Sequence, residues 1–243
     1  MGIEMSTPVH LAVALVTAHL LGDFVFQSRK IIDRKRNVLV LIAHALVVAA
    51  LSYALAGAWA IWEIFVVVLI THAVIDFIKV ASKRHGLLAF SLDQGAHLAV
   101  IGVLIWRLDL APVALSWVTR FGNRVTEVLV VIAAVIAATK VSGIIIEKAI
   151  RPFQEQLPAS VREQGFLAGG GTIGRLERLL ILVFVLMGEP GAIGFLIAAK
   201  SVLRFGELRD HRKEAEYVII GTMWSFVCGL VVALGARAVL GVI

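Results

Sequence analysis

The sequence predicts an all-α, polytopic membrane protein, a transmembrane helix bundle with about seven or eight membrane segments. Of the 243 residues, 60% are hydrophobic and only 16% are charged, and the mean hydropathy is +0.94. Soluble domains are about 45–50% apolar and about 25% charged. Runs of about 20 apolar residues recur along this chain, and such runs form helices in lipid because their backbone groups must bond to one another.

Seven long apolar runs and one shorter run predict the membrane segments. They are Pro8–Ser28, Val38–Gly57, Ile61–Val80, Phe90–Leu110, Val125–Glu147, Ile173–Met187 and Tyr217–Leu240, with Gly191–Phe205 as the shorter run. Glu189-Pro190-Gly191 predicts a tight turn before the shorter run, so residues 173–205 form either two crossings or a re-entrant pair. We expect a single membrane domain over 1–243, with a four-helix part at 1–110 and further helices at 125–243.

The positive charges indicate the orientation of the chain. Eighteen of the 23 Lys and Arg residues fall in alternate connections, at Arg29–Arg36, Lys79–Arg84, Lys148–Arg178 and Lys200–Lys213. Basic residues collect in cytoplasmic loops, which places the N-terminus outside. The cytoplasmic loops therefore account for the net charge of +6, and we expect no nucleic acid as a partner. The single cysteine, Cys228, excludes an internal disulfide, and we expect no cleaved signal peptide.

Three of the predicted spans carry a histidine and an aspartate four residues apart, a spacing that puts both on one helix face. The pairs are His19 and Asp23, His72 and Asp76, and Asp93 and His97, and the second span adds His44. Because successive spans run in opposite directions, every pair places its aspartate nearer the cytoplasm and its histidine one turn deeper. The histidines then lie on the order of 10 Å from the cytoplasmic helix ends. The sequence therefore predicts that all seven side chains face one site.

Four imidazoles and three carboxylates suit a divalent metal such as Zn²⁺, Mn²⁺ or Fe²⁺. Seven ligands can hold one ion, or two ions about 3.5–4 Å apart with a bridging carboxylate. We expect all seven residues to bind metal, and Asp23, Asp76 and Asp93 also to act in catalysis. Ionisable groups at membrane depth are costly and commonly functional. The alternatives are hydrogen bonds that join the helices, or carboxylates that only orient the ligating histidines.

Polar residues predicted near the cytoplasmic side are candidates for substrate binding. They are Lys79, Lys140, Arg175, Glu177, Lys200 and Arg204. Arg and Lys side chains that converge beside a metal suit a phosphate or a phospholipid headgroup. The alternative is the ordinary basic surface of cytoplasmic loops, and for Lys79 an interfacial ion pair. The run GGGTIG, residues 169–174 at the end of the connection 151–172, indicates a flexible hinge.

At these residues the chain resembles a bacterial membrane family, DUF3307, which has no established activity. The matching stretches are HLLGDFVFQS, His44, THAVIDFIK and DQGAH, and GRLERLLI, IGFLIAAKSVLRF and EYVIIGTMWSF resemble the C-terminal region of longer members. The resemblance implies a bacterial cytoplasmic (inner) membrane protein. A looser similarity, through the His-x-x-x-Asp pairs, is to membrane-bound metal-dependent hydrolases, and such an analogy does not fix function.

These observations favour an intramembrane metal-dependent hydrolase that acts on a lipid or a lipid-linked phosphate near the cytoplasmic side. The membrane lipids would then be its partners, and the oligomeric state is not predicted. A transporter for metal ions or protons is the first alternative, because ionisable residues at membrane depth also line transport pathways. A scaffold with a structural metal is the second, and closed coordination without an open position would support it.

Overall fold

The computed structural model describes residues 7–82, 84–108, 115–157, 166–205 and 212–243, and the described residues form helices without any strand. Six helical runs are long and apolar enough to cross a membrane. They are Pro8–Phe26, Val38–Ala56, Glu63–Ser82, Leu87–Leu108, Arg124–Gln154 and Glu216–Val242. These runs confirm the prediction of an all-helical membrane protein.

The number of long apolar helices in the described residues is six, which is lower than the predicted seven or eight segments. The difference lies in residues 173–205. Helix α10 (Phe166–Leu186) is 21 residues long but carries three charged residues, at 175, 177 and 178, and the apolar part of α11 (Gly191–Phe205) covers only Gly191–Val202. Two crossings and a re-entrant pair both remain compatible with this hairpin.

The chain forms two compact units, whose boundary falls inside one continuous helical run. Unit 1 is Met1–Ile136 with Leu240–Ile243, and unit 2 is Ala137–Val239. The run consists of α7 (Arg124–Ile136), the π-helix η2 (Ala137–Val141) and α8 (Ser142–Gln154). Whether both units belong to a single membrane domain stays a prediction.

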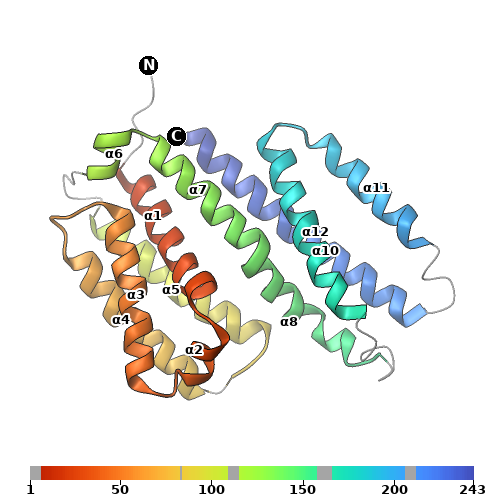
Figure 1. Cartoon of the computed structure of the whole chain (residues 1–243), viewed down its shortest axis with the longest axis horizontal. Helices are drawn as coiled ribbons and strands as arrows, with labels where there is room; N and C mark the ends of the chain where they lie inside the picture. The colour runs from red at the N-terminus through yellow and green to blue at the C-terminus, as the bar shows by residue number, and fades with distance from the viewer. Residues whose placement is uncertain (1–6, 83, 109–114, 158–165, 206–211) are drawn as a thin grey trace. The chain divides into compact units, whose positions relative to one another are not determined.

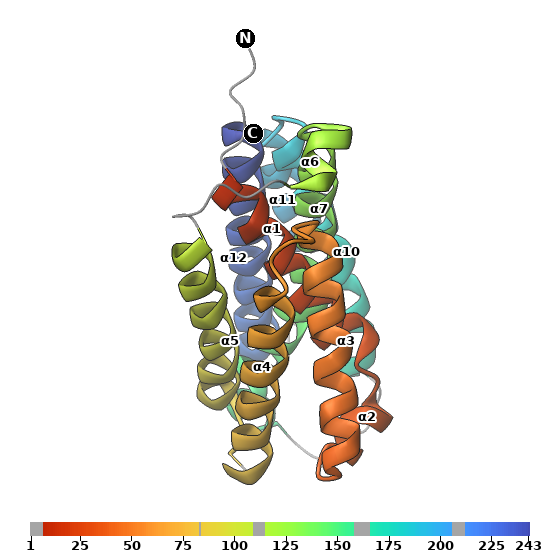
Figure 2. The same ribbon diagram turned by 90° about the vertical axis from the view of Figure 1, so that its left-hand side faces the viewer.

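Unit 1 contains a ring of four helices (Figures 1 and 2). The ring consists of α1 (Thr7–Leu21), α3 (Val38–Ala56), α4 (Glu63–Ser82) and α5 (Leu87–Leu108). The ring carries all the predicted His and Asp residues except Asp23, which lies on the π-helix that continues α1. Helix α1 contacts α3 and α5, and α4 contacts the same two helices from the other side. The short helices α2 (Arg29–Arg34) and α6 (Ser116–Phe121) lie at opposite ends of the unit, and α2 contacts α3.

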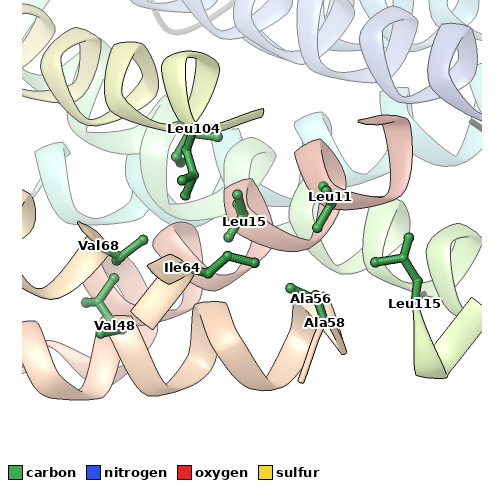
Figure 3. Close-up of a cluster of buried hydrophobic side chains, with 11 residues drawn as sticks. Leu11, Leu15, Val48, Ala56, Ala58, Ile64, Val68, Leu104 and Leu115 are labelled. Atoms are coloured by element: carbon green, nitrogen blue, oxygen red, sulfur yellow. The ribbon is translucent and has the colours of Figure 1, made fainter. Parts of the chain in front are cut away.

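An apolar cluster fills the end of this ring opposite to α2 (Figure 3). It includes Leu11 and Leu15 of α1, Val48 of α3, Ile64 and Val68 of α4, and Ile101 and Leu104 of α5. In α1 and α4 the cluster residues precede the His and Asp positions, and in α3 and α5 they follow them. Antiparallel helices therefore separate unit 1 into a polar layer near α2 and an apolar layer beyond it.

A short π-helix, η1 (Gly22–Phe26), continues α1 and carries Asp23. A Cβ added at Gly22 would lie only 2.6 Å from a methyl carbon of Val48, so the glycine allows η1 and α3 to approach closely. Single π turns inside α-helices are frequent at functional sites. The close approach brings Asp23 next to the histidine of α3.

Unit 2 contains η2, α8, α10, α11 and most of α12 (Arg212–Val242). The predicted connection 151–172 is largely helical, because α8 continues to Gln154 and α10 begins at Phe166. The glycine run at 169–171 therefore lies in a helix, and the expected hinge is wrong. Glycine lowers helix propensity by about 1 kcal/mol, which is small beside leaving backbone groups unbonded in lipid. Pro158, from the same connection, lies outside the described residues.

Candidate metal centre

Four helices of unit 1 bring seven buried side chains to one level of the ring. His19 comes from α1 and Asp23 from η1, His44 from α3, His72 and Asp76 from α4, and Asp93 and His97 from α5. None of these residues is more than 9% exposed. The imidazole rings lie against one another, with centroids 4.4 Å apart for His72 and His97 and 4.8 Å for His19 and His97.

Four of the ligand-type atoms form a compact group. The Nε2 atoms of His44 and His72 lie 3.2 Å apart, and Asp23 Oδ1 lies 3.1 and 3.3 Å from them. Asp76 Oδ2 lies 3.7 Å from His44 Nε2 and 3.6 Å from His72 Nε2. Tetrahedral zinc with bonds of 2.0–2.1 Å to nitrogen and oxygen has its ligand atoms about 3.3–3.4 Å apart. The two imidazole nitrogens and Asp23 Oδ1 have separations close to three edges of such a tetrahedron, and Asp76 Oδ2 lies slightly farther from both nitrogens.

Lysine 35 is a buried member of this group that the sequence did not single out. Its Nζ donates to Asp76 Oδ2 at 2.5 Å, and Lys35 is only 5% exposed. The residue lies just after α2, so its side chain reaches from the surface helix into the ring. The ammonium stabilises the Asp76 carboxylate in the apolar interior, where an unpaired charge is costly.

The α5 side of the site has its own hydrogen-bond network. Lys79 Nζ donates to Asp93 Oδ2 at 2.5 Å, and the Gln94 amide donates to the same oxygen at 3.0 Å. Gln94 Oε1 lies 3.1 Å from His19 Nε2. Asp93 Oδ1 and His97 Nε2 are buried and have no hydrogen-bond partner among the described residues. Lys79, predicted to bind substrate, therefore pairs with a site carboxylate.

A small cavity adjoins the histidines on the side away from α2. Its volume is about 20 Å³, and its polar lining comes from His19, His72, His97, Ser52 and Thr71. A cavity of this size holds about one water molecule. The apolar part of its lining includes Leu15 and Val68 from the apolar layer. The cavity is therefore a water-sized space at the boundary between the two layers.

The comparison with protein families places this site within one matched region. Residues 11–126 match the family described as protein of unknown function, DUF3307. This matched stretch, referred to below as the DUF3307 region, covers a little under half of the chain. The comparisons with curated proteins and with solved structures gave no match. The looser similarity to membrane-bound metal-dependent hydrolases therefore rests on the His-x-x-x-Asp pattern alone.

The DUF3307 region contains all four histidines and all three aspartates of the predicted site, together with Lys79. The other predicted substrate-binding residues lie in unit 2. Lys140 and Arg175 are exposed there, and Lys200 Nζ donates to Glu177 at 2.6 Å. The side chain of Arg204 lies outside the described residues. Glu177 and Lys200 thus form an ion pair within unit 2.

Arg178 is a buried cation of unit 2. The sequence analysis did not single it out. Its Nε donates to the carbonyl oxygen of Ala138 at 2.5 Å, and its Nη1 donates to Ser225 Oγ at 3.0 Å. Ala138 lies in η2, where the widened turn disturbs the regular backbone bonding. Glycines at 174 and 229 face the arginine closely, within 3.1–3.3 Å of an added Cβ. Arg178 therefore stabilises an irregular helix turn.

We expect Arg178→Met to lower the free energy of unfolding by about 1–3 kcal/mol, because it leaves the Ala138 carbonyl without its donor. Arg175→Met is the matched control, since Arg175 is exposed and bonds only locally, to Thr172 Oγ1 at 3.0 Å. Thermal unfolding of both purified variants in detergent measures the difference. Equal unfolding temperatures for the two variants would contradict this role of Arg178.

Proposed function

We propose that this protein is an intramembrane metal-dependent hydrolase that acts on a lipid or a lipid-linked phosphate. The observation that carries the proposal is the pair of imidazole nitrogens from His44 and His72, 3.2 Å apart, with one oxygen each of Asp23 and Asp76 at 3.1–3.7 Å from both. These residues come from three separate segments, α3, α4 and η1, and hydrogen bonds between helices alone would not require two carboxylate oxygens beside the same two imidazole nitrogens. A divalent ion satisfies them all together.

The ion would be held by the two imidazole nitrogens and the two carboxylate oxygens of this group. When bound, it supplies a Lewis acid and lowers the pKa of a water molecule. Asp93 is the carboxylate best suited to accept a proton, because it is not one of these four ligands and its Oδ1, like that of Asp76, is buried without a hydrogen-bond partner among the described residues. Lys79 and Gln94 hold the other oxygen of Asp93 and thereby orient the free one.

The layering of unit 1 favours an enzyme over a transporter. A transport pathway needs access from both membrane faces, whereas the apolar cluster closes the ring on the side away from α2. Leu11, Leu15 and Ile64 in that cluster are fully buried. His10, the main polar candidate beyond the cluster, bonds to Thr126 Oγ1 at 2.6 Å. The apolar cluster therefore leaves the α2 side as the side from which a substrate would approach the site.

The α2 side also suits an anionic substrate. Arg29, Lys30, Arg34 and Arg36 are exposed on and beside α2. Under the positive-inside rule this end faces the cytoplasm, which places the N-terminus outside in a bacterial cytoplasmic membrane. The cavity of about 20 Å³ holds one water molecule and is too small for a headgroup. The phosphate would then approach from the basic end, and the water would attack from inside the ring.

The test is metal-dependent release of inorganic phosphate by the full chain in lipid nanodiscs. The substrates are phosphatidic acid and a polyprenyl diphosphate, each offered with Zn²⁺ or Mn²⁺. We expect hydrolysis that EDTA abolishes and that Asp93→Asn lowers by at least about 100-fold. Asp33→Asn, an exposed aspartate of α2, is the control and should keep full activity. Metal bound to the protein without hydrolysis of either substrate would overturn the hydrolase proposal.

A further inference from the structure

The hydrogen bonds around Gln94 fix which nitrogen of His19 carries the proton. The Gln94 amide nitrogen donates to the Asp93 carboxylate at 3.0 Å, so its carbonyl oxygen faces His19. A carbonyl only accepts, and His19 Nε2 must therefore be the donor in the 3.1 Å bond. In neutral His19 the lone pair then lies on Nδ1, which is 4.0 Å from Asp23 Oδ2.

His97 is held in the complementary way. Its Nδ1 lies 2.9 Å from the backbone carbonyl of Asp93 and must donate to it, which leaves the lone pair on Nε2. This Nε2 is buried and has no hydrogen-bond partner among the described residues. The His97 ring stacks on that of His19, with centroids 4.8 Å apart and an angle of 25°. Two neighbouring imidazoles thus present lone pairs, on His19 Nδ1 and His97 Nε2, and the second of these atoms has no donor among the described residues.

We propose that His19 Nδ1, His97 Nε2 and Asp23 Oδ2 form a second divalent-cation subsite, with the Asp23 carboxylate bridging two ions. The first oxygen of Asp23 faces His44 and His72 at 3.1 and 3.3 Å, and the second oxygen faces His19. A single carboxylate thus has one oxygen beside His44 and His72 and the other toward His19, whose ring stacks on that of His97. Two ions bridged in this way are about 3.5–4 Å apart, as in other two-metal hydrolytic sites.

Charge balance indicates when the second ion binds. The three aspartates of the site exceed its two lysines, Lys35 and Lys79, by a single negative charge. One dication changes the net charge of the site from negative to positive. A second dication adds further positive charge, which a bound anion would offset. A phosphate group carries about 1.5–2 negative charges near neutral pH and bonds to both ions. The second ion is therefore expected to bind together with phosphate.

This inference rests on the proposed metal centre, and its test separates the two. The full chain in detergent is equilibrated with Mn²⁺ and inorganic phosphate, and bound metal is counted by mass spectrometry. We expect two Mn²⁺ per chain and an exchange-coupled EPR signal. His97→Ala should bind one Mn²⁺ and give the signal of an isolated ion. His10→Gln, another buried histidine with an unpartnered Nε2, is the control and should keep two.

Gln94→Leu provides a second route that leaves every ligand in place. It frees the ring of His19, and the loss of such an orienting bond typically weakens metal binding about 10–100-fold. We expect that loss for the second Mn²⁺ alone, with the first unchanged. One Mn²⁺ in both wild type and His97→Ala would overturn the second subsite and leave the metal centre standing. No bound Mn²⁺ in the wild type would overturn both proposals.

Discussion

We expect that replacing His44 and His72 together with alanine removes divalent metal binding from the purified protein and leaves its helix content unchanged. Their Nε2 atoms, 3.2 Å apart, are the two nitrogen ligands of the four-atom group. Loss of a single orienting contact to a metal ligand already costs about 10–100-fold in affinity, so loss of both nitrogens should exceed 100-fold. Metal content by mass spectrometry and zinc affinity by competition with a chelator measure the effect.

The matched control for this variant is His85→Ala, which removes a histidine outside the ring. It should bind as much metal as the wild type. Circular dichroism and size-exclusion chromatography verify that each variant is folded. A folded His44→Ala/His72→Ala protein that still retains one zinc per chain would show that the metal lies elsewhere. The seven polar side chains would then serve as hydrogen bonds between the helices.

The layered arrangement of the ring could be predicted from the sequence, because it depends only on the helical spacing of residues and on the alternating direction of successive helices. The spacing of four places His72 and Asp76 on one face of α4, and the alternating direction of the helices sets the order of each pair. The same alternation carries Leu15, Val68 and Ile101 to the opposite side of the histidines. A helix period and a membrane topology were therefore enough to predict which side chains meet.

The residues that the sequence did not reveal depend on irregular geometry. Lys35 is one of five basic residues at 29–36, and only the turn after α2 directs its side chain inward. Arg178 is explained by the π turn at Ala138, which has no clear sequence signature. Gln94 did have a signal, since it lies three residues before His97 on α5 and so shares its helix face.

The number of long apolar helices among the described residues is lower than the predicted number of spans for a related reason. Apolar length alone suggested a crossing at 173–187, but Glu177 and Arg178 are buried there in a network of polar contacts within unit 2. These charges interrupt the apolar run, so α10 does not count among the long apolar helices. The structure instead continues the helix back to Phe166, so that the charged turn lies inside α10 rather than at its end.

The second large effect is expected at Lys35, whose ammonium donates to the same Asp76 oxygen that faces His44 and His72. Lys35→Met leaves a buried carboxylate without its cation, and breaking such a pair costs about 3–5 kcal/mol. Without metal, the unfolding temperature should fall on the order of 10 °C. A bound zinc ion supplies the missing positive charge, so zinc should restore most of the loss.

The same reasoning predicts that zinc binds Lys35→Met more tightly than it binds the wild type, by about tenfold or more. In the wild type a dication must approach within a few ångströms of an ammonium, and the variant removes that repulsion. Thermal unfolding with and without zinc measures both effects in one experiment. Arg34→Met, at the exposed neighbouring position, should change neither quantity.

A double variant identifies the carboxylate through which Lys35 acts. In Lys35→Met/Asp76→Asn the buried negative charge is also absent, so the double variant should be more stable than Lys35→Met alone in metal-free buffer. The zinc-dependent recovery should disappear with the carboxylate. If Lys35→Met instead loses the same stability in the presence and absence of zinc, the ammonium supports the fold only. If both effects occur as expected, Lys35 holds the charge of the metal-free site and competes with the metal for Asp76.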